Sequence, residues 1–383
     1  MQARSASAFR WDEPPAWVFL TFMVLTGLLT FTQQQLYSDI SVPGWVLAWS
    51  LVIIYALPVL LAVFAFDLFS RKHLTPLVAA MAWGAIAATS LAALANEGWT
   101  MALSRMTGPD VAAVWVAAVT APWVEEALKL AGVVLIILMM RDRVSDLMDG
   151  FVLGAMCGLG FSIVEDVFYF MAVFGGEPAG VLQGFFVRVV ANGLYGHLLY
   201  TGLGGMGVAY FATRRGRRSQ ARRVAVASSF IFLGVFAHFL WNTPWLDLFP
   251  TRPWSTVDLV ILPIAVLVKA IPLVLFVGVL GILSARRRRR WVGILGDAQV
   301  PGGKFVAGLG SRVGARRAVR EMRARAGDGA GQILRRLQGA MLRAAMLVDR
   351  GGLEGSGVEA AFEECASLDT ALSAIPGAPS ASG

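Results

Sequence analysis

Long apolar stretches follow one another through most of the chain, separated by short polar segments. A transmembrane helix needs about 20 predominantly apolar residues. By that measure the pattern predicts about eight spans, at 16–32, 45–67, 75–96, 112–140, 149–174, 187–212, 224–246 and 257–284. We therefore expect an all-α fold, a polytopic helical membrane protein whose transmembrane domain covers 1–284.

The amino-acid composition supports the same class of protein. Of the 383 residues, 57% are hydrophobic and only 15% are charged, whereas a soluble domain has about 25% charged residues. Cys157 falls in a predicted span and Cys365 near the C-terminus, so no disulfide framework is expected. The composition therefore fits a multi-pass membrane protein.

Arginine and lysine collect on alternate loops. The loops on one side, with both termini, hold Arg4, Arg10, Arg71, Lys72, Arg141, Arg143 and the stretches 214–223 and 286–290. The loops on the other side carry only Arg105 and Arg252, with Arg188 at a boundary. The positive-inside rule therefore predicts that both termini face the cytoplasm. Arginine also far outnumbers lysine, as in GC-rich bacterial genomes, which predicts a protein of the bacterial cytoplasmic (inner) membrane.

A basic tail over 285–383 follows the last predicted span. Helical spacing recurs in 315–326, in 332–350 and in the shorter segment 359–372. In 332–350 the apolar stripe consists of Ile333, Leu334, Leu337, Met341 and Leu342. We expect a short helical or partly disordered cytoplasmic tail. Whether it folds on itself, lies on the inner leaflet or binds a partner stays open at this point.

The net charge of +8 mainly reflects these basic loops. Basic clusters beside spans attract anionic lipid headgroups, so the lipid bilayer is an expected partner. A nucleic-acid partner is not expected, because the clusters adjoin spans and contain no interleaved aromatic residues. The pattern carries no signal of an oligomeric state.

Four predicted spans carry polar side chains within otherwise apolar sequence. An ionisable group at bilayer depth costs about 3 kcal/mol or more, so such residues are usually functional. The four sets are Glu125, Glu126 and Lys129; Phe161, Glu165 and Asp166; His197 and Thr201; and His238, Trp241 and Asn242. At about 1.5 Å of rise per residue, all four sets fall in one layer, in the middle to outer half of the bilayer.

Glycines predict close helix packing beside this layer. Gly150, Gly154 and Gly158 recur every four residues, a spacing that lets another helix approach closely. The span at 187–212 is also rich in glycine. Tight packing of this kind would keep a polar centre away from lipid.

The polar layer contains the groups needed for general acid–base hydrolysis of an amide. Glu125 and Glu126 cannot both ionise freely in a low-dielectric site, while Lys129 favours the charged form of one of them. One carboxyl group can then take a proton from water while another donates to the leaving group. His238 and Asn242, one helical turn apart, can donate hydrogen bonds to an oxyanion. This interpretation needs no cofactor.

A zinc centre is the less favoured alternative. His197, His238 and Glu165 would form a two-histidine, one-carboxylate set with an open position for water. The sequence contains neither an HExxH nor a GxSxG motif, which argues against the common zinc and serine hydrolase arrangements. From the residues alone, no metal is favoured.

Four motifs together resemble the PrsW family of intramembrane proteases, in a superfamily that includes the CAAX prenyl endopeptidases. They are APWVEEALK (121–129), DGFVLGAMCGLGFSIVED (149–166), GHLLYTGLGG (196–205) and HFLWN (238–242), within a resemblance that covers 75–246. The family usually has a Glu-Asn pair at the end of the second motif, where this chain has Glu165 and Asp166.

The resemblance implies roles for the polar side chains. The adjacent glutamates, Glu125 and Glu126, would activate water. Glu165 and His197 would shape or assist the centre, and His238 with Asn242 would steady the oxyanion. The supporting positions expected from the residues themselves are Lys129, Phe161, Asp166, Thr201 and Trp241. The resemblance also implies a membrane-anchored protein substrate with a regulatory role.

We therefore expect an intramembrane endopeptidase of the glutamic type, with its motif-bearing spans at 112–246. A CAAX-type prenyl-protein endopeptidase, whose site would face the cytoplasm, is the nearest enzymatic alternative. A proton-coupled transporter would use the same carboxylates and imidazoles as a proton relay. A membrane peptide-binding scaffold would keep the fold without the chemistry.

Overall fold

The fold is known from a computed structural model. It describes residues 9–66, 74–141, 144, 146–191, 196–215, 218–244, 260, 262–297, 300–310, 312–351 and 356–379. The predicted loop cations Arg4, Arg71, Lys72, Arg143 and Arg252 lie outside these ranges. The described residues form helices and connecting segments with no strand, so the prediction of an all-α protein is confirmed.

The chain divides into two compact units. The membrane unit comprises Met1–Asp67, Lys72–Thr213 and Gln220–Val279. The tail unit comprises Leu68–Arg71, Arg214–Ser219 and Leu280–Gly383.

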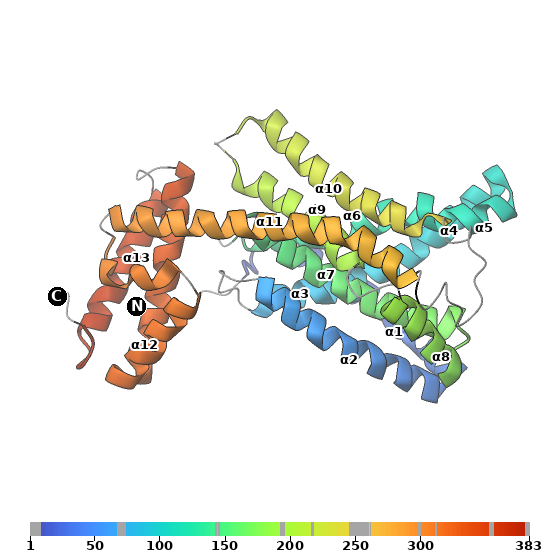
Figure 1. Ribbon diagram of the computed structural model, residues 1–383, viewed down its shortest axis with the longest axis horizontal. Coiled ribbons are helices and arrows are strands. Elements are labelled where there is room, and N and C mark those ends of the chain that lie inside the picture. Colours follow the sequence, from blue (N-terminus) through green and yellow to red (C-terminus); the bar gives the residue numbers. More distant parts are fainter. Residues whose placement is uncertain are drawn as a thin grey trace. The chain divides into compact units, whose positions relative to one another are not determined.

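Five helices of the membrane unit, drawn in Figure 1, begin where the sequence supplies a start signal. Pro14, Pro109, Pro122 and Pro178 occupy first-turn positions, where a missing N–H breaks no helical hydrogen bond. Before the central helix, Asp146 and Asp149 form a reciprocal capping box. The helices are α1 (Pro14–Ile40), α2 (Val42–Phe66), α3 (Leu74–Ala82), α4 (Thr89–Thr107), α5 (Pro109–Val119), α6 (Ala121–Met139), α7 (Leu147–Phe168), α8 (Pro178–Phe185), α9 (Gly196–Thr213), α10 (Gln220–Asn242) and α11 (Leu262–Asp297), with π-helical stretches η1 (Trp83–Ala88), η2 (Tyr169–Val173) and η3 (Phe186–Ala191).

Five helical segments in the described part of the chain are long and apolar enough to cross a membrane. They are Pro14–Ile40, Val42–Leu61, Leu74–Thr107, Leu147–Val173 and Gln220–Asn242. Each contains or overlaps one of the predicted spans. The chain is therefore a polytopic membrane protein.

The prediction of one unbroken span over 112–140 is wrong. Helix α5 ends at Val119 and α6 begins at Ala121, with Thr120 between them. Pro122 has no N–H to donate to a carbonyl of the preceding turn, which interrupts the hydrogen-bond ladder at this point. Glu125 and Glu126 consequently lie just after the first turn of a separate helix.

Two other predicted spans have different boundaries in the structure. Within 187–212, η3 ends at Ala191 and α9 begins at Gly196, and the residues between them lie outside the described ranges. Helix α11, which contains most of 257–284, continues to Asp297.

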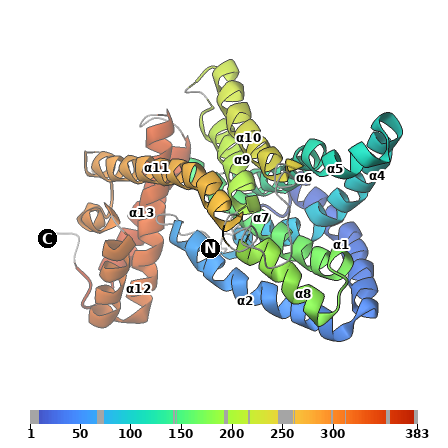
Figure 2. The same ribbon diagram turned by 45° about the vertical axis from the view of Figure 1, so that its right-hand side comes forward.

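Helix α7 passes through the middle of the membrane unit, and nearly all of its residues are buried (Figures 1 and 2). Its predicted glycine row is the surface on which α9 packs. A Cβ atom on Gly150, Gly154 or Gly158 would run into the carbonyl oxygens of Gly205, Thr201 and His197, respectively. The row therefore fixes where α9 presents Thr201 and His197.

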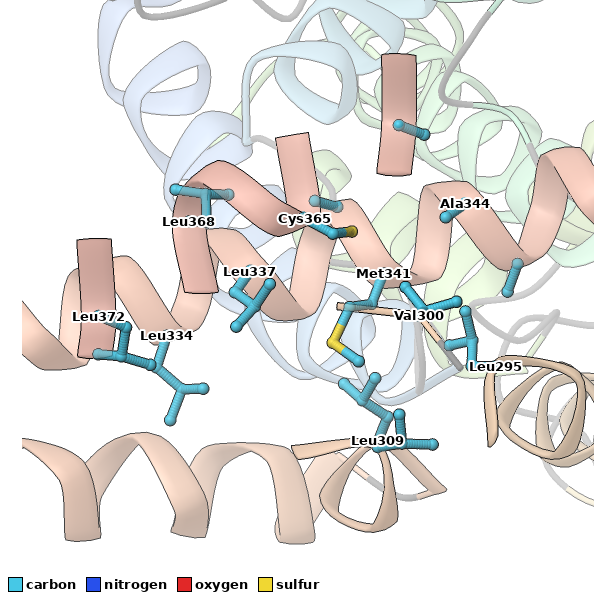
Figure 3. Close-up of a cluster of buried hydrophobic side chains, with 14 of the residues drawn as sticks. Leu295, Val300, Leu309, Leu334, Leu337, Met341, Ala344, Cys365, Leu368 and Leu372 are labelled. Atoms are coloured by element: carbon cyan, nitrogen blue, oxygen red, sulfur yellow. The ribbon is translucent and has the colours of Figure 1, made fainter. Parts of the chain in front are cut away.

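The tail unit has its own hydrophobic core (Figure 3). Of the alternatives left open by the sequence, namely folding on itself, lying on the inner leaflet or binding a partner, the structure shows the first. Its helices are the last part of α11, η6 (Gly303–Phe305), η7 (Ala307–Gly310), α12 (Arg312–Gly351) and α13 (Ser356–Ser373). The predicted stripe is inside: Leu334, Leu337 and Met341 are fully buried. Figure 3 shows these side chains with Cys365, Leu368 and Leu372 of α13.

Gly154→Ala should lower the thermal unfolding midpoint of the detergent-solubilised protein. The added methyl group would collide with backbone, so α7 and α9 must separate, and overpacking typically costs about 1–3 kcal/mol. Gly278→Ala in α11 is the matched control, because a Cβ there meets no atom within 4 Å. Equal midpoints for the two variants would contradict this packing.

Cys365 should react with a maleimide at pH 8 only after the tail unit unfolds. Its side chain is buried, and this burial, with the nearby Glu364 carboxylate, raises the pKa of the thiol to about 11. Because the thiolate is the reactive form, native protein should label slowly and denatured protein quickly. Ser367→Cys in a Cys365→Ala background places the thiol at an exposed site of the same helix and should label at once. Equal native labelling rates would rule out the buried position.

Candidate active site

A buried ammonium group lies at the centre of the polar layer. The Lys129 side chain is 0% exposed. Its Nζ lies 2.7 Å from Glu126 Oε1, 2.9 Å from His197 Nδ1 and 3.4 Å from Glu125 Oε2. It also lies 3.9 Å from the centroid of the Phe161 ring. The three N–H groups of the ammonium therefore have three acceptors, and an aromatic face covers it.

Glu126 is enclosed on all sides by partners. Its Oε2 accepts a 2.7 Å hydrogen bond from the Thr201 hydroxyl. Its Oε1 accepts from Lys129 and, at 3.1 Å, from His238 Nδ1. Glu126 is 1% exposed and does not line the neighbouring cavity. Its carboxylate is thus committed to orienting other side chains.

Glu125 faces the cavity instead. Its Oε1 accepts a 3.2 Å hydrogen bond from Asn96 of α4, and its Oε2 lies 3.8 Å from His238 Nε2. Adjacent residues of a helix point about 100° apart. That rotation gives the two neighbouring glutamates different surroundings.

The hydrogen bonds assign a tautomer to each histidine. An ammonium can only donate, so His197 Nδ1 accepts from Lys129, and His197 Nε2 donates to Glu165 Oε2 at 3.0 Å. His238 Nδ1 donates to Glu126, which leaves Nε2 as an acceptor, 3.3 Å from Asn242 Nδ2. The unprotonated His238 Nε2 is therefore on the same side as Glu125 Oε2.

Aromatic contacts hold the two imidazoles together. The ring centroids of His197 and His238 are 4.8 Å apart with the planes nearly perpendicular. Tyr200, one helical turn from His197, stacks on His238 at 5.1 Å. Phe161 packs against His197 at 5.0 Å.

Glu165 and Asp166 share one cation. Arg188 of η3 donates from Nη2 to Glu165 Oε2 and from Nε to Asp166 Oδ1, both at 2.7 Å. The Tyr55 hydroxyl of α2 donates to Asp166 Oδ2 at 2.8 Å. Asp166 therefore has a direct ion pair, but with a guanidinium that it shares with Glu165.

Asn242 of α10 contacts both α5 and His238. Its Nδ2 donates to the Ala117 carbonyl oxygen of α5 at 2.9 Å and reaches His238 Nε2. Trp241 beside it lines the cavity.

The cavity next to these groups has a volume of about 640 Å³. Its walls come from α1, α4, α5, α6, α7, α9 and α10, with Tyr169 of η2 and Arg188 of η3. Among the site residues, those that line it are Glu125, Phe161, Glu165, His197, His238, Trp241 and Asn242. The structure thus brings the predicted polar sets of all four spans into one place, with Glu126 and Lys129 beneath them.

Sequence reasoning missed two polar residues of this site. Asn96 is the last residue of the predicted span 75–96, and the hydropathy pattern does not mark its amide as functional. Arg188 falls at the predicted boundary of a span. The signal that could have identified it is its apolar neighbours, Val187 and Val189, which make it an arginine within apolar sequence. Both line the cavity and contact a predicted site carboxylate.

Three side chains are placed to hold a metal ion. One ligand atom each of Glu125, His197 and His238 lies within 4.8 Å of the other two. This grouping differs from the predicted zinc set, because Glu125 takes the place of Glu165. The Glu165 carboxylate instead binds Arg188 and His197 Nε2.

The fold defines a polytopic helical membrane protein, and its cavity is lined by carboxylates and imidazoles, the groups that hydrolases use for general acid–base chemistry. Over residues 72–291 the chain matches the family described as PrsW family intramembrane metalloprotease. The chain therefore belongs to the PrsW family of intramembrane proteases, which confirms the resemblance seen in its motifs. No curated protein and no solved structure matches it.

Thr201→Val should destabilise the protein, whereas Thr201→Ser should not. Valine has the same shape but leaves a buried carboxylate oxygen of Glu126 without its donor, and an unsatisfied buried group costs about 1–3 kcal/mol. The measurement is the thermal unfolding midpoint in detergent. Thr107→Val is the control, since that exposed hydroxyl bonds only to backbone oxygens of residues 103 and 108. A Thr201→Val midpoint equal to the control would contradict the contact.

Proposed function

We propose that this protein hydrolyses a peptide bond of a membrane-anchored, regulatory protein in the cavity beside Glu125, His197 and His238. The proposed setting is the bacterial cytoplasmic membrane, with both termini inside. The observation that carries the proposal is the hydrogen bond from His238 Nδ1 to Glu126, at 3.1 Å. It directs the lone pair of His238 Nε2 toward Glu125 and the cavity.

Donor chemistry supports a divalent metal at this place. Two imidazoles and one carboxylate are a common ligand set of catalytic zinc. His238 already has the carboxylate partner on its other nitrogen that metal-binding histidines usually have. His197 has Glu165 on Nε2, so a metal would take Nδ1, the nitrogen that accepts from Lys129 in this structure. When bound, zinc would polarise the substrate carbonyl and make water acidic enough to attack at neutral pH.

The ionisable side chains around the cavity carry an excess of negative charge that a bound cation would neutralise. In the described part of the chain, the cluster comprises four carboxylates and two cations, namely Glu125, Glu126, Glu165, Asp166, Lys129 and Arg188. If all are ionised the formal charge is −2, counting four negative and two positive groups. A divalent ion would balance it, as would two protons on the carboxylates.

The protein's own residues then have distinct roles. Glu126 would orient His238, and Glu165 would orient His197. Asn242 would donate to the carbonyl oxygen that gains charge. His238 is not the donor in this assignment, because its proton is used on Glu126, whereas the Asn242 N–H that now reaches His238 Nε2 would turn to the substrate oxygen.

A metal-free glutamate mechanism is the second candidate. The Lys129 ammonium already lies 3.4 Å from Glu125 Oε2 and 2.9 Å from His197 Nδ1, so a positive charge is present without a metal. In this mechanism Glu125, the glutamate that faces the cavity, takes a proton from water. Metal content therefore separates the two candidates.

Glu125→Gln should abolish cleavage while the protein remains folded. The test uses purified full-length protein in liposomes with single-span membrane proteins, chosen by comparing new protein termini in membranes with and without the protein. Glu177→Gln, at an exposed helix N-cap, is the control and should cleave normally. Cleavage that persists in Glu125→Gln would exclude the proposed site.

A chelator should stop cleavage, and zinc should restore it, if the metal site is real. Roughly one zinc per chain, lost in Glu125→Gln and in His238→Ala, would accompany activity. Full activity in a protein without metal would instead support the glutamate mechanism. Preference for a prenylated C-terminal peptide over a single-span protein would favour the CAAX-type alternative.

A further inference from the structure

Arg188 reaches the site from outside the four motif-bearing segments. It lies on η3, between α8 and α9, and its side chain is 21% exposed. The guanidinium plane stacks over the Tyr169 ring, with Cζ 3.7 Å from the ring centroid. Stacking and two 2.7 Å ion pairs hold it in one orientation, with Nε toward Asp166 and Nη2 toward Glu165.

The Glu165 oxygen that Arg188 binds is the oxygen that His197 uses. Glu165 Oε2 accepts from Arg188 Nη2 at 2.7 Å and from His197 Nε2 at 3.0 Å. A guanidinium keeps a neighbouring carboxylate ionised and fixes where its oxygens lie. The chain of contacts thus runs from Arg188 through Glu165 to His197, and from His197 Nδ1 to Lys129.

We propose that Arg188 is a positioning residue of the protease site, which acts through Glu165 to fix the tautomer and orientation of His197. The inference rests on the proposed function and adds a residue to it. Without the guanidinium, Glu165 would rotate toward solvent in the cavity. His197 would then lose the acceptor that holds its proton on Nε2.

Two other roles for Arg188 make different predictions. A residue that only neutralises Asp166 would become dispensable once that charge is removed. A residue that binds substrate would change KM and substrate capture more than kcat. A positioning residue changes kcat and loses its effect when Glu165 is already altered.

The test measures kcat and KM on the single-span protein that the wild type cleaves, with full-length protein in liposomes. Arg188→Gln should lower kcat about 10- to 100-fold, as loss of an orienting partner of a histidine does, with KM nearly unchanged. Arg188→Lys, which keeps the charge but not the two-pronged geometry, should fall between Arg188→Gln and the wild type. Tyr55→Phe, on the far side of Asp166, should match the wild type.

A double-mutant cycle shows whether Arg188 acts through Glu165. In a Glu165→Gln background, Arg188→Lys should cause no further loss of kcat, because its target is already changed. Additive losses would overturn the proposal. So would a Tyr55→Phe loss equal to that of Arg188→Gln, since it would indicate general disruption of the network.

Asp166→Asn combined with Arg188→Gln should remain as slow as Arg188→Gln alone. Restoration of wild-type kcat would reduce Arg188 to a counter-ion and overturn the proposal.

A capture experiment tests the substrate-binding alternative. In an inactive Glu125→Gln background, adding Arg188→Gln should leave the amount of captured intact substrate unchanged. A loss of captured substrate would assign Arg188 to substrate binding. Should Arg188→Gln not fold, Arg188→Lys and the cycle decide the question.

The two hypotheses fail in different ways. If the proposed function is wrong, the wild type and Glu125→Gln behave alike. If only the positioning role is wrong, Glu125→Gln is inactive while Arg188→Gln keeps kcat within about threefold of the wild type, well below the loss expected for an orienting partner.

Discussion

The ion pair between Lys129 and Glu126 is the interaction on which the polar centre depends. Both side chains are almost fully buried, and the charged atoms are 2.7 Å apart. Removing one member of such a pair costs about 3–5 kcal/mol, because the other charge is left without a partner. The pair contacts Glu125, Thr201, His197 and His238 directly, and the two histidines extend these contacts to Glu165 and Asn242.

Backbone packing brings the partners within reach. Helix α7 has no side chain at Gly150, Gly154 and Gly158, so α9 lies directly against it. This contact carries Thr201 to Glu126 and His197 to Lys129 and Glu165. The small residues and the ionisable residues are thus parts of one arrangement, since a wider helix spacing would leave the charges unpaired in an apolar interior.

The site has an inner and an outer tier. The inner tier, Glu126 with Lys129, is sealed and orients its neighbours. The outer tier faces the cavity and comprises Glu125, His197, His238, Glu165 and Asn242. Such a division separates the groups that are open to the cavity from the enclosed ion pair that they contact. From η3, the Arg188 guanidinium bridges the carboxylates of Glu165 and Asp166.

Sequence alone determined the membrane class, the helical tail and the polar residues of the centre, because hydropathy and helical period report which residues avoid water. It could not settle the break at Thr120, because Pro122 signals an interruption but Pro58 and Pro272 lie inside continuous helices. Nor could it show that Glu125 opens to the cavity while Glu126 is enclosed. Those outcomes, and the arrival of Asn96 and Arg188, depend on distances between helices that are remote in sequence, and only tertiary packing sets such distances.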